Sequence, residues 1–181
     1  MWESEEAVRF VHRVSSTRSE FGHAVTEAVR DPALAALLIA KASQAAELGV
    51  ELRVAPDSAL PVLSPELSTD VATVVGNLVD NAMDAASGAG ERWVEVGVGL
   101  VDDEVDVVVR DSGPGVPPGM EAEVFRRGVS TKEGAVPGGR GIGLSLVQLV
   151  CTRRGGEVTA SSSDGSVFTA RIPVGASLVD A

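Results

Sequence analysis

Aromatic residues, cysteine and histidine are rare in this sequence, and each shortage excludes a kind of core or site. There is no tyrosine among the 181 residues, and only four phenylalanines and two tryptophans, so the core must be aliphatic, which the 44% hydrophobic content can supply. The single cysteine, Cys151, excludes an internal disulfide framework and any metal site built from several cysteines. Cys151 lies in an apolar run, and we predict that its thiol is buried and inert.

Basic residues are also scarce, with 15 lysines and arginines against 26 acidic residues and a formal net charge of −11. Nucleic-acid-binding proteins normally carry a basic face, so we predict that nucleic acid is not a partner. The charge is typical of a solvated surface. No apolar run approaches the roughly 18 residues that a bilayer span needs. The first residues, Met1 to Glu6, are acidic and polar, unlike a signal peptide, and we expect a cytoplasmic location.

The length suits one domain with a small appendage. Residues 3–29 have loosely helical spacing and form the predicted N-terminal helical appendage, residues 1–30. Asp31 and Pro32 are typical of an N-cap and a first helical residue, and they predict a helix that ends at Gly49. We therefore predict that the main domain covers residues 31–175.

The rest of the chain alternates between strand and helix patterns. Segments with the apolar pattern of β-strands are residues 50–54, 93–100, 105–110, 157–161 and 167–172. Segments with helical spacing are residues 66–86 and 141–153. Residues 111–140 are rich in glycine and proline and show little periodicity beyond a short helix near 121–125. A loop of this length inside a compact domain is usually functional.

Three polar residues lie on one face of the helix predicted at 66–86. Asn77, Asn81 and Asp84 follow the spacing i, i+4 and i+7. An amide oxygen is a suitable ligand for Mg²⁺, which takes few protein ligands and keeps its waters and the substrate phosphates. Alternatively, the two asparagines only cap neighbouring loops.

Asp111 ends a valine-rich strand and enters a glycine-rich turn. Its carboxylate could accept a hydrogen bond from an exocyclic amine such as that of adenine. Gly113 and Gly115 would let a flat base approach the backbone, because they have no Cβ. The alternative is an ordinary turn of this common composition.

The third motif is a run of glycines, residues 138–144, at the start of the second predicted helix. Backbone N–H groups at a helix start attract anions. The run is neither a Walker A motif nor a Rossmann fingerprint, since it lacks the lysine of the first and the preceding strand of the second. The same loop contains four basic residues, Arg126, Arg127, Lys132 and Arg140. Their clustering in an acidic chain favours the binding of a polyanion over the alternative that they only make the surface soluble.

Together these motifs resemble the N, G1, F and G2 boxes of the Bergerat-fold ATPases, which include sensor histidine kinases, DNA gyrase and a chaperone family. The matching residues are Asn77-x-x-x-Asn81, Asp111-x-Gly113-x-Gly115, Phe125 and Gly139-x-Gly141-x-Gly143-Leu144. The match covers roughly residues 50–173. Residues 111–115, 125–132, 31–38 and 49–52 are most similar to the citrate/C4-dicarboxylate-sensor group of bacterial histidine kinases.

The resemblance implies an α/β fold, a two-layer α/β sandwich. We expect a mixed, mainly antiparallel sheet of about five strands, with one face covered by the helices 66–86 and 141–153. ATP would lie between these helices under a lid formed by residues 116–138. Residues 1–30 would be a partial dimerisation or linker helix, and residues 31–175 the ATP-binding catalytic domain.

The resemblance also assigns roles to single residues. Asn81 would bind Mg²⁺, Asn77 would line the phosphate region, and Asp111 would accept a hydrogen bond from adenine N6. The glycines of the first turn would shape the base pocket, Phe125 would anchor the lid, and the later glycines would form its hinge and the phosphate cradle. The complete implied ATP-binding set is Asn77, Asn81, Asp84, Asp111, Gly113, Gly115, Phe125, Thr131, Lys132, Gly139, Arg140, Gly141, Ile142, Gly143 and Leu144.

Asn77 stands where ATP-hydrolysing relatives carry a glutamate that activates water, and asparagine cannot act as that base. The site is therefore expected to present the γ-phosphate of ATP for transfer. His12 and His23 are not followed by the acidic residue that is typical of phosphoacceptor histidines. We expect that the acceptor histidine lies outside this chain, so the chain alone would bind ATP without autophosphorylating.

The expected parent is a membrane-anchored homodimeric sensor. Its partners would be ATP, its own histidine-bearing dimerisation helix and a response regulator. Two alternatives stay open at this point: an anti-sigma-factor-like serine kinase, and a regulatory ATP-binding module without transfer chemistry.

Overall fold

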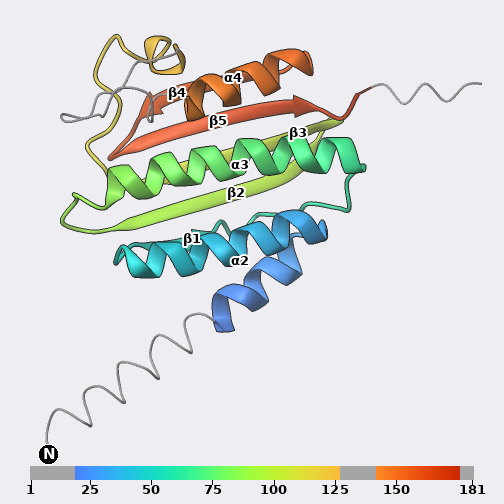
Figure 1. Ribbon diagram of the computed structural model, residues 1–181, viewed down its shortest axis with the longest axis horizontal. Coiled ribbons are helices and arrows are strands. Elements are labelled where there is room, and N and C mark those ends of the chain that lie inside the picture. Colours follow the sequence, from blue (N-terminus) through green and yellow to red (C-terminus); the bar gives the residue numbers. More distant parts are fainter. Residues whose placement is uncertain (1–18, 127–141, 176–181) are drawn as a thin grey trace, which may run out of the picture.

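The computed structural model describes residues 19–126 and 142–175, which form one layer of helices on one face of a five-stranded sheet (Figure 1). A helix over residues 19–28 comes first. The following elements are α2 (Pro32–Glu47), β1 (Glu51–Val54), α3 (Pro65–Ala86), β2 (Trp93–Val101), β3 (Glu104–Asp111), the 3₁₀ helix η1 (Glu123–Phe125), α4 (Gly143–Arg153), β4 (Glu157–Ser162) and β5 (Ser166–Pro173).

The strand order in the sheet is β1-β2-β3-β5-β4. Strand β1 pairs with β2 in parallel, and the other neighbours are antiparallel. The predicted α/β sandwich with a mixed, mainly antiparallel sheet is confirmed. The hairpins close where the sequence provides suitable turns: Asp102 and Asp103 both have positive φ between β2 and β3, as do Asp164 and Gly165 between β4 and β5.

Helices α2 and α3 begin in the same way, with a polar cap followed by proline. Asp31 Oδ1 accepts a hydrogen bond from Leu34 N at 3.0 Å, and Ser64 Oγ accepts one from Leu67 N at 3.3 Å. In both cases the proline occupies the first helical position, where its missing N–H costs nothing. Local sequence therefore sets where both helices start.

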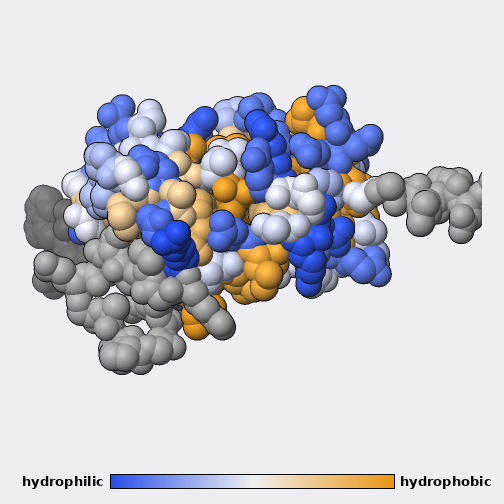
Figure 2. Space-filling model, turned by 90° about the horizontal axis from the view of Figure 1, so that it is seen from above, coloured by the Kyte–Doolittle hydropathy of each residue, from blue (hydrophilic) through white to orange (hydrophobic). Residues whose placement is uncertain are grey.

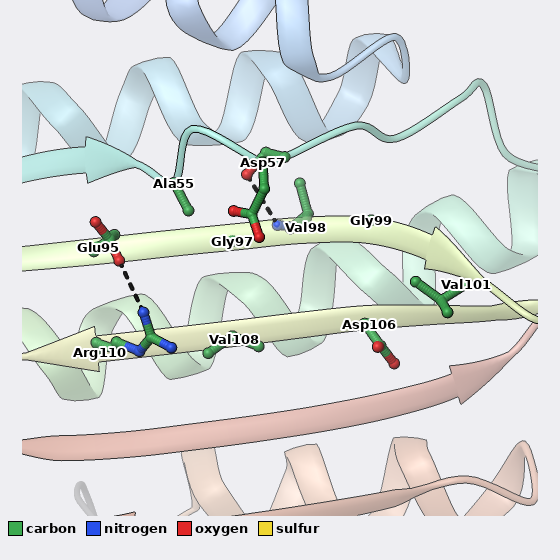
Figure 3. Close-up of a pocket in the computed structure, with 11 residues that line it drawn as sticks. Ala55, Asp57, Glu95, Gly97, Val98, Gly99, Val101, Asp106, Val108 and Arg110 are labelled. Atoms are coloured by element: carbon green, nitrogen blue, oxygen red, sulfur yellow. Dashed lines mark hydrogen bonds and ion pairs between the residues drawn. The ribbon is translucent and has the colours of Figure 1, made fainter. Parts of the chain in front are cut away.

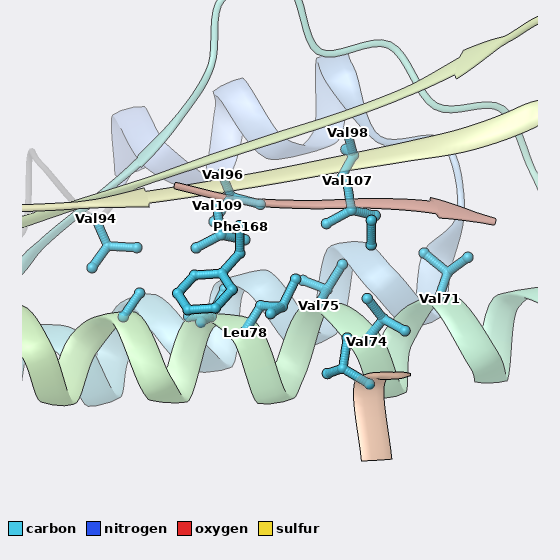
Figure 4. Close-up of a cluster of buried hydrophobic side chains, with 14 of the residues drawn as sticks. Val71, Val74, Val75, Leu78, Val94, Val96, Val98, Val107, Val109 and Phe168 are labelled. Atoms are coloured by element: carbon cyan, nitrogen blue, oxygen red, sulfur yellow. The ribbon is translucent and has the colours of Figure 1, made fainter. Parts of the chain in front are cut away.

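The core lies between α3 and the sheet and is mostly aliphatic, as the composition predicts. Val71, Val74, Val75 and Leu78 of α3 are fully buried and point at valines of β2 and β3, with Phe168 of β5 among them (Figure 4). Burying one such side chain contributes roughly 1.5–3 kcal/mol to folding. The inner face of α3 therefore fixes the helix on the sheet and leaves its polar face toward α4 and the site.

Cys151 of α4 belongs to the same core, and the prediction that it is buried is confirmed. Burial raises the pKa of its thiol to about 11, so the group is a neutral thiol at neutral pH. In the described ranges no helix combines the length and the apolar character that a membrane crossing needs.

The helix over residues 19–28 is packed on the domain at its C-terminal end. Val25 and Val29 are buried in the common core, and Arg30 N donates to Leu60 O at 2.8 Å. The buried Asp31 carboxylate also accepts from Ser68 Oγ at 2.9 Å, so it connects the starts of α2 and α3. The domain boundary at residues 30 and 31 stays a prediction, and residues 1–18 lie outside the described part.

The second face of the sheet carries no helix layer in the described ranges, and its side chains are largely charged. Glu95 of β2 and Arg110 of β3 form an ion pair of 3.3 Å beside a shallow groove of about 200 Å³, where Gly97 provides space (Figure 3). Figure 2 shows a different side, seen from above the view of Figure 1, where apolar areas lie among polar ones. Exposed pairs of this kind stabilise a protein by about 0–1 kcal/mol each, so this face is mainly a solvated surface.

An ion-pair cluster connects α3 with the C-terminal end of α4. Arg153 and Arg154 both donate hydrogen bonds to the carboxylate of Asp70, whose side chain is 12% exposed. Burial by itself would raise the pKa of Asp70, but the hydrogen bonds from Arg154 and Arg153 outweigh it and hold the pKa below its ordinary value. The folded state therefore favours the charged form of Asp70.

This pKa shift predicts a stability loss in acid. A carboxyl whose pKa is lower in the folded than in the unfolded chain stabilises the fold above the unfolded-state pKa, about 3.9, and this contribution disappears as the pH falls through the folded-state value. We expect Asp70→Asn to lower the free energy of unfolding by about 1–3 kcal/mol at pH 7. The difference from the wild type should shrink below about pH 4.

Urea denaturation of both proteins between pH 7 and pH 3 measures this effect. Asp103→Asn, in the exposed β2–β3 turn, is the matched control and should leave the free energy of unfolding nearly unchanged. A difference between wild type and Asp70→Asn that stays constant down to pH 3 would contradict the assigned role of the cluster.

Candidate functional site

A cavity of about 760 Å³ opens beside the C-terminal half of α3. It is bounded by α3, the turn after β3, η1, the start of α4 and strand β5. Its volume falls in the range of roughly 300–1,000 Å³ that is common for small-molecule sites. The lining residues are Asn81, Asp84, Ala85, Ser87, Gly88, Ala89, Ser112, Gly113, Pro114, Gly115, Val116, Pro117, Val124, Leu144, Ser166 and Phe168.

The polar face of α3 forms one wall of this cavity. Asn81 is half-buried and Asp84 is exposed, and both line the cavity. Asn77 lies one turn earlier, where its Nδ2 donates to Thr73 O at 2.8 Å. Its Oδ1 faces the first turn of α4, since a Cβ added to Gly143 would lie 3.0 Å from this atom. Asn77 therefore lies between the wall and the start of α4.

Asp111, the last residue of β3, lies directly behind the cavity wall and is 1% exposed. Its Oδ1 accepts hydrogen bonds from Gly113 N at 2.8 Å and from Ser166 N at 3.4 Å. One carboxylate oxygen thus holds both the turn after β3 and the start of β5. An ordinary exposed turn does not bury its aspartate in this way, and the arrangement gives the wall a fixed acceptor.

The two glycines of the turn are required by close packing. A Cβ on Gly113 would lie 2.8 Å from Asp111 Oδ1 and 2.9 Å from Ala85 Cβ, so the turn contacts α3 directly. Gly115 has φ +82° and lies against the end of β4, where a Cβ would be 2.9 Å from Ser162 Oγ. The absence of a Cβ at both positions therefore lets the backbone of this turn pack directly against α3 and β4.

Phe125, the last residue of η1, is buried. Its ring packs edge-on against Phe168 of β5, with the ring centroids 6.1 Å apart and an interplanar angle of 88°. The neighbouring Val124 lines the cavity. The role of Phe125 as the anchor of a lid stays a prediction, and Arg126 after it pairs with Glu123 at 2.9 Å.

Helix α4 begins two residues later than predicted, at Gly143 instead of Gly141. Ile142 is its N-cap residue and is 50% exposed, and no side chain of the described residues caps this helix start. Leu144 lines the cavity, so the uncapped N–H groups of the first turn lie at its edge. Such a helix start is a suitable place for an anion.

Part of the predicted set lies outside the described residues, and the structure places none of it. These positions are Thr131, Lys132, Gly139, Arg140 and Gly141, and Arg127 of the basic cluster lies outside the described residues as well. Of the predicted set that is described, Asn81, Asp84, Gly113, Gly115 and Leu144 line one cavity. Asn77, Asp111, Phe125 and Gly143 support its walls from behind.

Most of the residues that line the cavity were not predicted from sequence, among them Ser112, Ser166 and Phe168. Ser166 and Phe168 of β5 line the cavity, and Ser112 Oγ accepts from Trp93 N at 2.9 Å and donates to Trp93 O at 3.2 Å. Ser112 thereby ties the turn to β2. A weak signal existed for Ser166, because it directly follows the predicted hairpin turn, but nothing local in the sequence places β5 beside Asp111.

The residues present fit a magnesium ion brought in with a phosphate ligand. Asn81 offers a half-buried amide oxygen on the cavity wall, the kind of hard donor that Mg²⁺ accepts. In the described ranges no group of three or more His, Cys, Asp or Glu side chains could hold a metal ion by itself. Any Mg²⁺ would thus depend on oxygens from the ligand and from water.

Comparison with known proteins shows to which family this chain belongs. The family described as "Histidine kinase-, DNA gyrase B-, and HSP90-like ATPase" matches residues 66–176, and the chain belongs to this family. Its structure is similar to the catalytic domain of histidine kinase ThkA, with a TM-score of 0.63 and 23% identity, covering 78% of this chain and 90% of that domain. That likeness confirms the fold.

Two relatives narrow the comparison to one group within the family. Sensor protein CitS of Halalkalibacterium halodurans is 35% identical over 174 residues, which cover 93% of this chain and 32% of CitS. A probable C4-dicarboxylate sensor kinase of the same organism is 33% identical over 176 residues, covering 94% of this chain and 32% of that kinase. The resemblance to the citrate/C4-dicarboxylate-sensor group is confirmed. The chain spans about a third of the length of these relatives.

Proposed function

We propose that this chain is the ATP-binding catalytic domain of a two-component sensor histidine kinase. The observation that carries the proposal is the cavity itself. It combines a half-buried asparagine on one wall, a glycine turn backed by the buried Asp111, and an uncapped helix start at Leu144. These are an amide ligand for a cation, a fixed acceptor beside a wall of glycine backbone, and an anion site, which together suit Mg²⁺-ATP.

Each wall supports a different part of the nucleotide. Adenine would lie against the backbone of Gly113 and Gly115, with its amino group directed toward the Asp111 end of the wall. The phosphates would extend toward the first turn of α4, where free N–H groups and the helix dipole favour negative charge. Asn81 would hold Mg²⁺, which neutralises charge on the phosphates.

The chemistry that remains is positioning for transfer. A nitrogen of the acceptor histidine attacks the γ-phosphorus, the bond to the β–γ bridging oxygen breaks, and ADP leaves with that electron pair. Asn77 lies near the start of α4 and has no proton-accepting group for water activation. We therefore infer slow hydrolysis and transfer to a partner histidine.

The acceptor is expected outside this chain. His23, on the helix over residues 19–28, is exposed but is followed by Ala24 instead of an acidic residue. The names of the relatives, a sensor protein and a sensor kinase, support a histidine kinase over the serine-kinase and regulatory alternatives. A homodimeric, membrane-anchored parent, its histidine-bearing helix and a response regulator belong to this proposal.

Calorimetric titration with ATP, with and without Mg²⁺, tests the nucleotide site. We expect a dissociation constant on the order of 1–100 µM with Mg²⁺ and weaker binding without it. Asn81→Ala should remove most of the Mg²⁺ effect while leaving the metal-free affinity nearly unchanged, because only the cation ligand is lost. Gln44→Ala, an exposed amide on α2, is the control. No binding, or a Mg²⁺ effect that survives Asn81→Ala, contradicts the assignment.

A second measurement separates the kinds of kinase. The chain is incubated with ATP and the histidine-bearing helices of the parent protein, and the phosphorylated product is treated with acid. Phosphohistidine is lost in acid, whereas phosphoserine survives. An acid-stable product would favour the serine kinase, and no product would favour the regulatory module.

A further inference from the structure

The far end of the turn after β3 is held by a single serine side chain from the edge strand of the sheet. Ser162, the last residue of β4, accepts a hydrogen bond from Val116 N at 2.8 Å through its Oγ and donates one to Val116 O at 2.9 Å. The two residues are separated by 46 positions in sequence. One hydroxyl thus satisfies both polar groups of one backbone residue, as a neighbouring strand would.

The residues around this hydrogen bond are in close contact. Ser162 shares its strand face with the buried Ala160, but it is itself exposed at the end of the strand. Its Oγ leaves no room for a side chain on Gly115, since a Cβ there would lie 2.9 Å away. Gly115 and Val116 both line the cavity. A shift of the Ser162 hydroxyl would therefore move the cavity wall directly.

The other backbone bonds of this segment lie at its near end, where Gly113 N donates to Asp111 Oδ1 at 2.8 Å and Ser112 N donates to Trp93 O at 3.1 Å. At its near end Ser112 is tied to Trp93 of β2, but Pro114 and Pro117 have no N–H to donate. The segment is thus held at one end by the bonds of Ser112 and Gly113 and at the other end by the hydroxyl of Ser162. Loss of the hydrogen bonds at either end would let the backbone between the two ends move.

We propose that Ser162 is a positioning residue that sets the width of the base-binding end of the cavity, and so determines affinity and base selectivity for the nucleotide. This inference rests on the proposed function, because it concerns the same site. Ser162 acts through the backbone of Gly115 and Val116 and needs no contact with the nucleotide.

The test compares Ser162→Ala with Ser162→Thr, which keeps the hydroxyl. Dissociation constants are measured for ATP and for ITP, whose base has a carbonyl where adenine has an amino group. Ser162→Ala should weaken ATP binding about fivefold to tenfold and lower the ATP-over-ITP preference, while Ser162→Thr stays within about twofold of the wild type. Ser161→Ala, an exposed serine one position earlier, should change neither value.

A merely structural role would not alter base preference in protein that remains folded, so thermal unfolding is recorded for each variant. Amide hydrogen exchange at Val116 in the nucleotide-free chain should be faster in Ser162→Ala and restored in Ser162→Thr. An unchanged ATP affinity and ATP-to-ITP ratio in folded Ser162→Ala would overturn the inference, as would failure of Ser162→Thr to restore them. Wild-type protein that binds no ATP would instead overturn the proposed function.

Discussion

Replacing Asp111 with asparagine is expected to weaken ATP binding about a hundredfold or more, which corresponds to roughly 2.7 kcal/mol. Asp111 is 1% exposed, and its carboxylate can accept hydrogen bonds but cannot donate them. Its Oδ1 accepts from Gly113 N at 2.8 Å and from Ser166 N at 3.4 Å. Asparagine would replace one acceptor oxygen with an NH₂ donor. This NH₂ group would then face either the backbone N–H donors or the amino group of adenine. Two donors that face each other in a buried site weaken binding.

Calorimetric titration of wild type and Asp111→Asn with Mg²⁺-ATP measures this loss. The matched control is Asp106→Asn on the same strand, because Asp106 lies on the opposite, solvated face and pairs with Arg171 at 3.9 Å. It should bind ATP like the wild type. Circular dichroism and thermal unfolding show whether Asp111→Asn remains folded. Folded Asp111→Asn that binds ATP within about threefold of the wild type would refute the role of Asp111.

Replacing Gly165 with alanine is expected to cost at least about 3 kcal/mol of stability and in the extreme case to prevent folding. Gly165 has φ +132°, and a Cβ there would lie 1.7 Å from the backbone oxygen of Asp111. Because the Cβ would meet backbone atoms of Asp111, no flexible side chain can move aside to relieve the clash. The β4–β5 hairpin would have to move away from β3, and Ser162 and Ser166 would move with it.

Gly155→Ala separates the clash from the cost of the backbone conformation alone. Gly155 also has positive φ, +78°, but nothing lies within 4 Å of its Cβ position. This variant should lose only about 1–2 kcal/mol, the ordinary cost of a left-handed residue with a side chain. Urea denaturation of both variants gives the comparison. Equal losses at the two positions would show that contact between the hairpin and Asp111 is unimportant.

The two large effects come from one structural unit. Asp111 and Gly165 meet where the end of β3 lies beside the β4–β5 hairpin, and the same hairpin carries the serine hydroxyl that ties Val116. Damage to the hairpin is therefore expected to reduce nucleotide binding as well as stability. Asp111→Asn, in contrast, should affect binding more than folding, because the backbone geometry can remain.

Much of the fold could be predicted because its signals are local. The valine alternation of residues 93–100 and 105–110 and the polar-cap-plus-proline starts at Asp31 and Ser64 act within a few residues of chain. Local signals were less accurate at Gly143, because a glycine-rich approach to a helix has no capping side chain to mark its first turn. The loosely helical spacing of residues 3–29 does not indicate that Val25 and Val29 join the core, because their partners lie far away in the chain.

By itself the sequence determined the elements, their approximate limits and the order of the polar and glycine-rich motifs. Only the tertiary structure decided which distant groups meet: Ser166 reaches Asp111 across 55 positions and Ser162 reaches Val116 across 46. The physical reason is the range of the forces. Periodicity and turn chemistry act over a few residues, whereas strand order follows from burying the whole apolar face of the sheet under α3. That burial places β5 between β3 and β4, and so assembles the wall of the site from segments that are far apart in the chain.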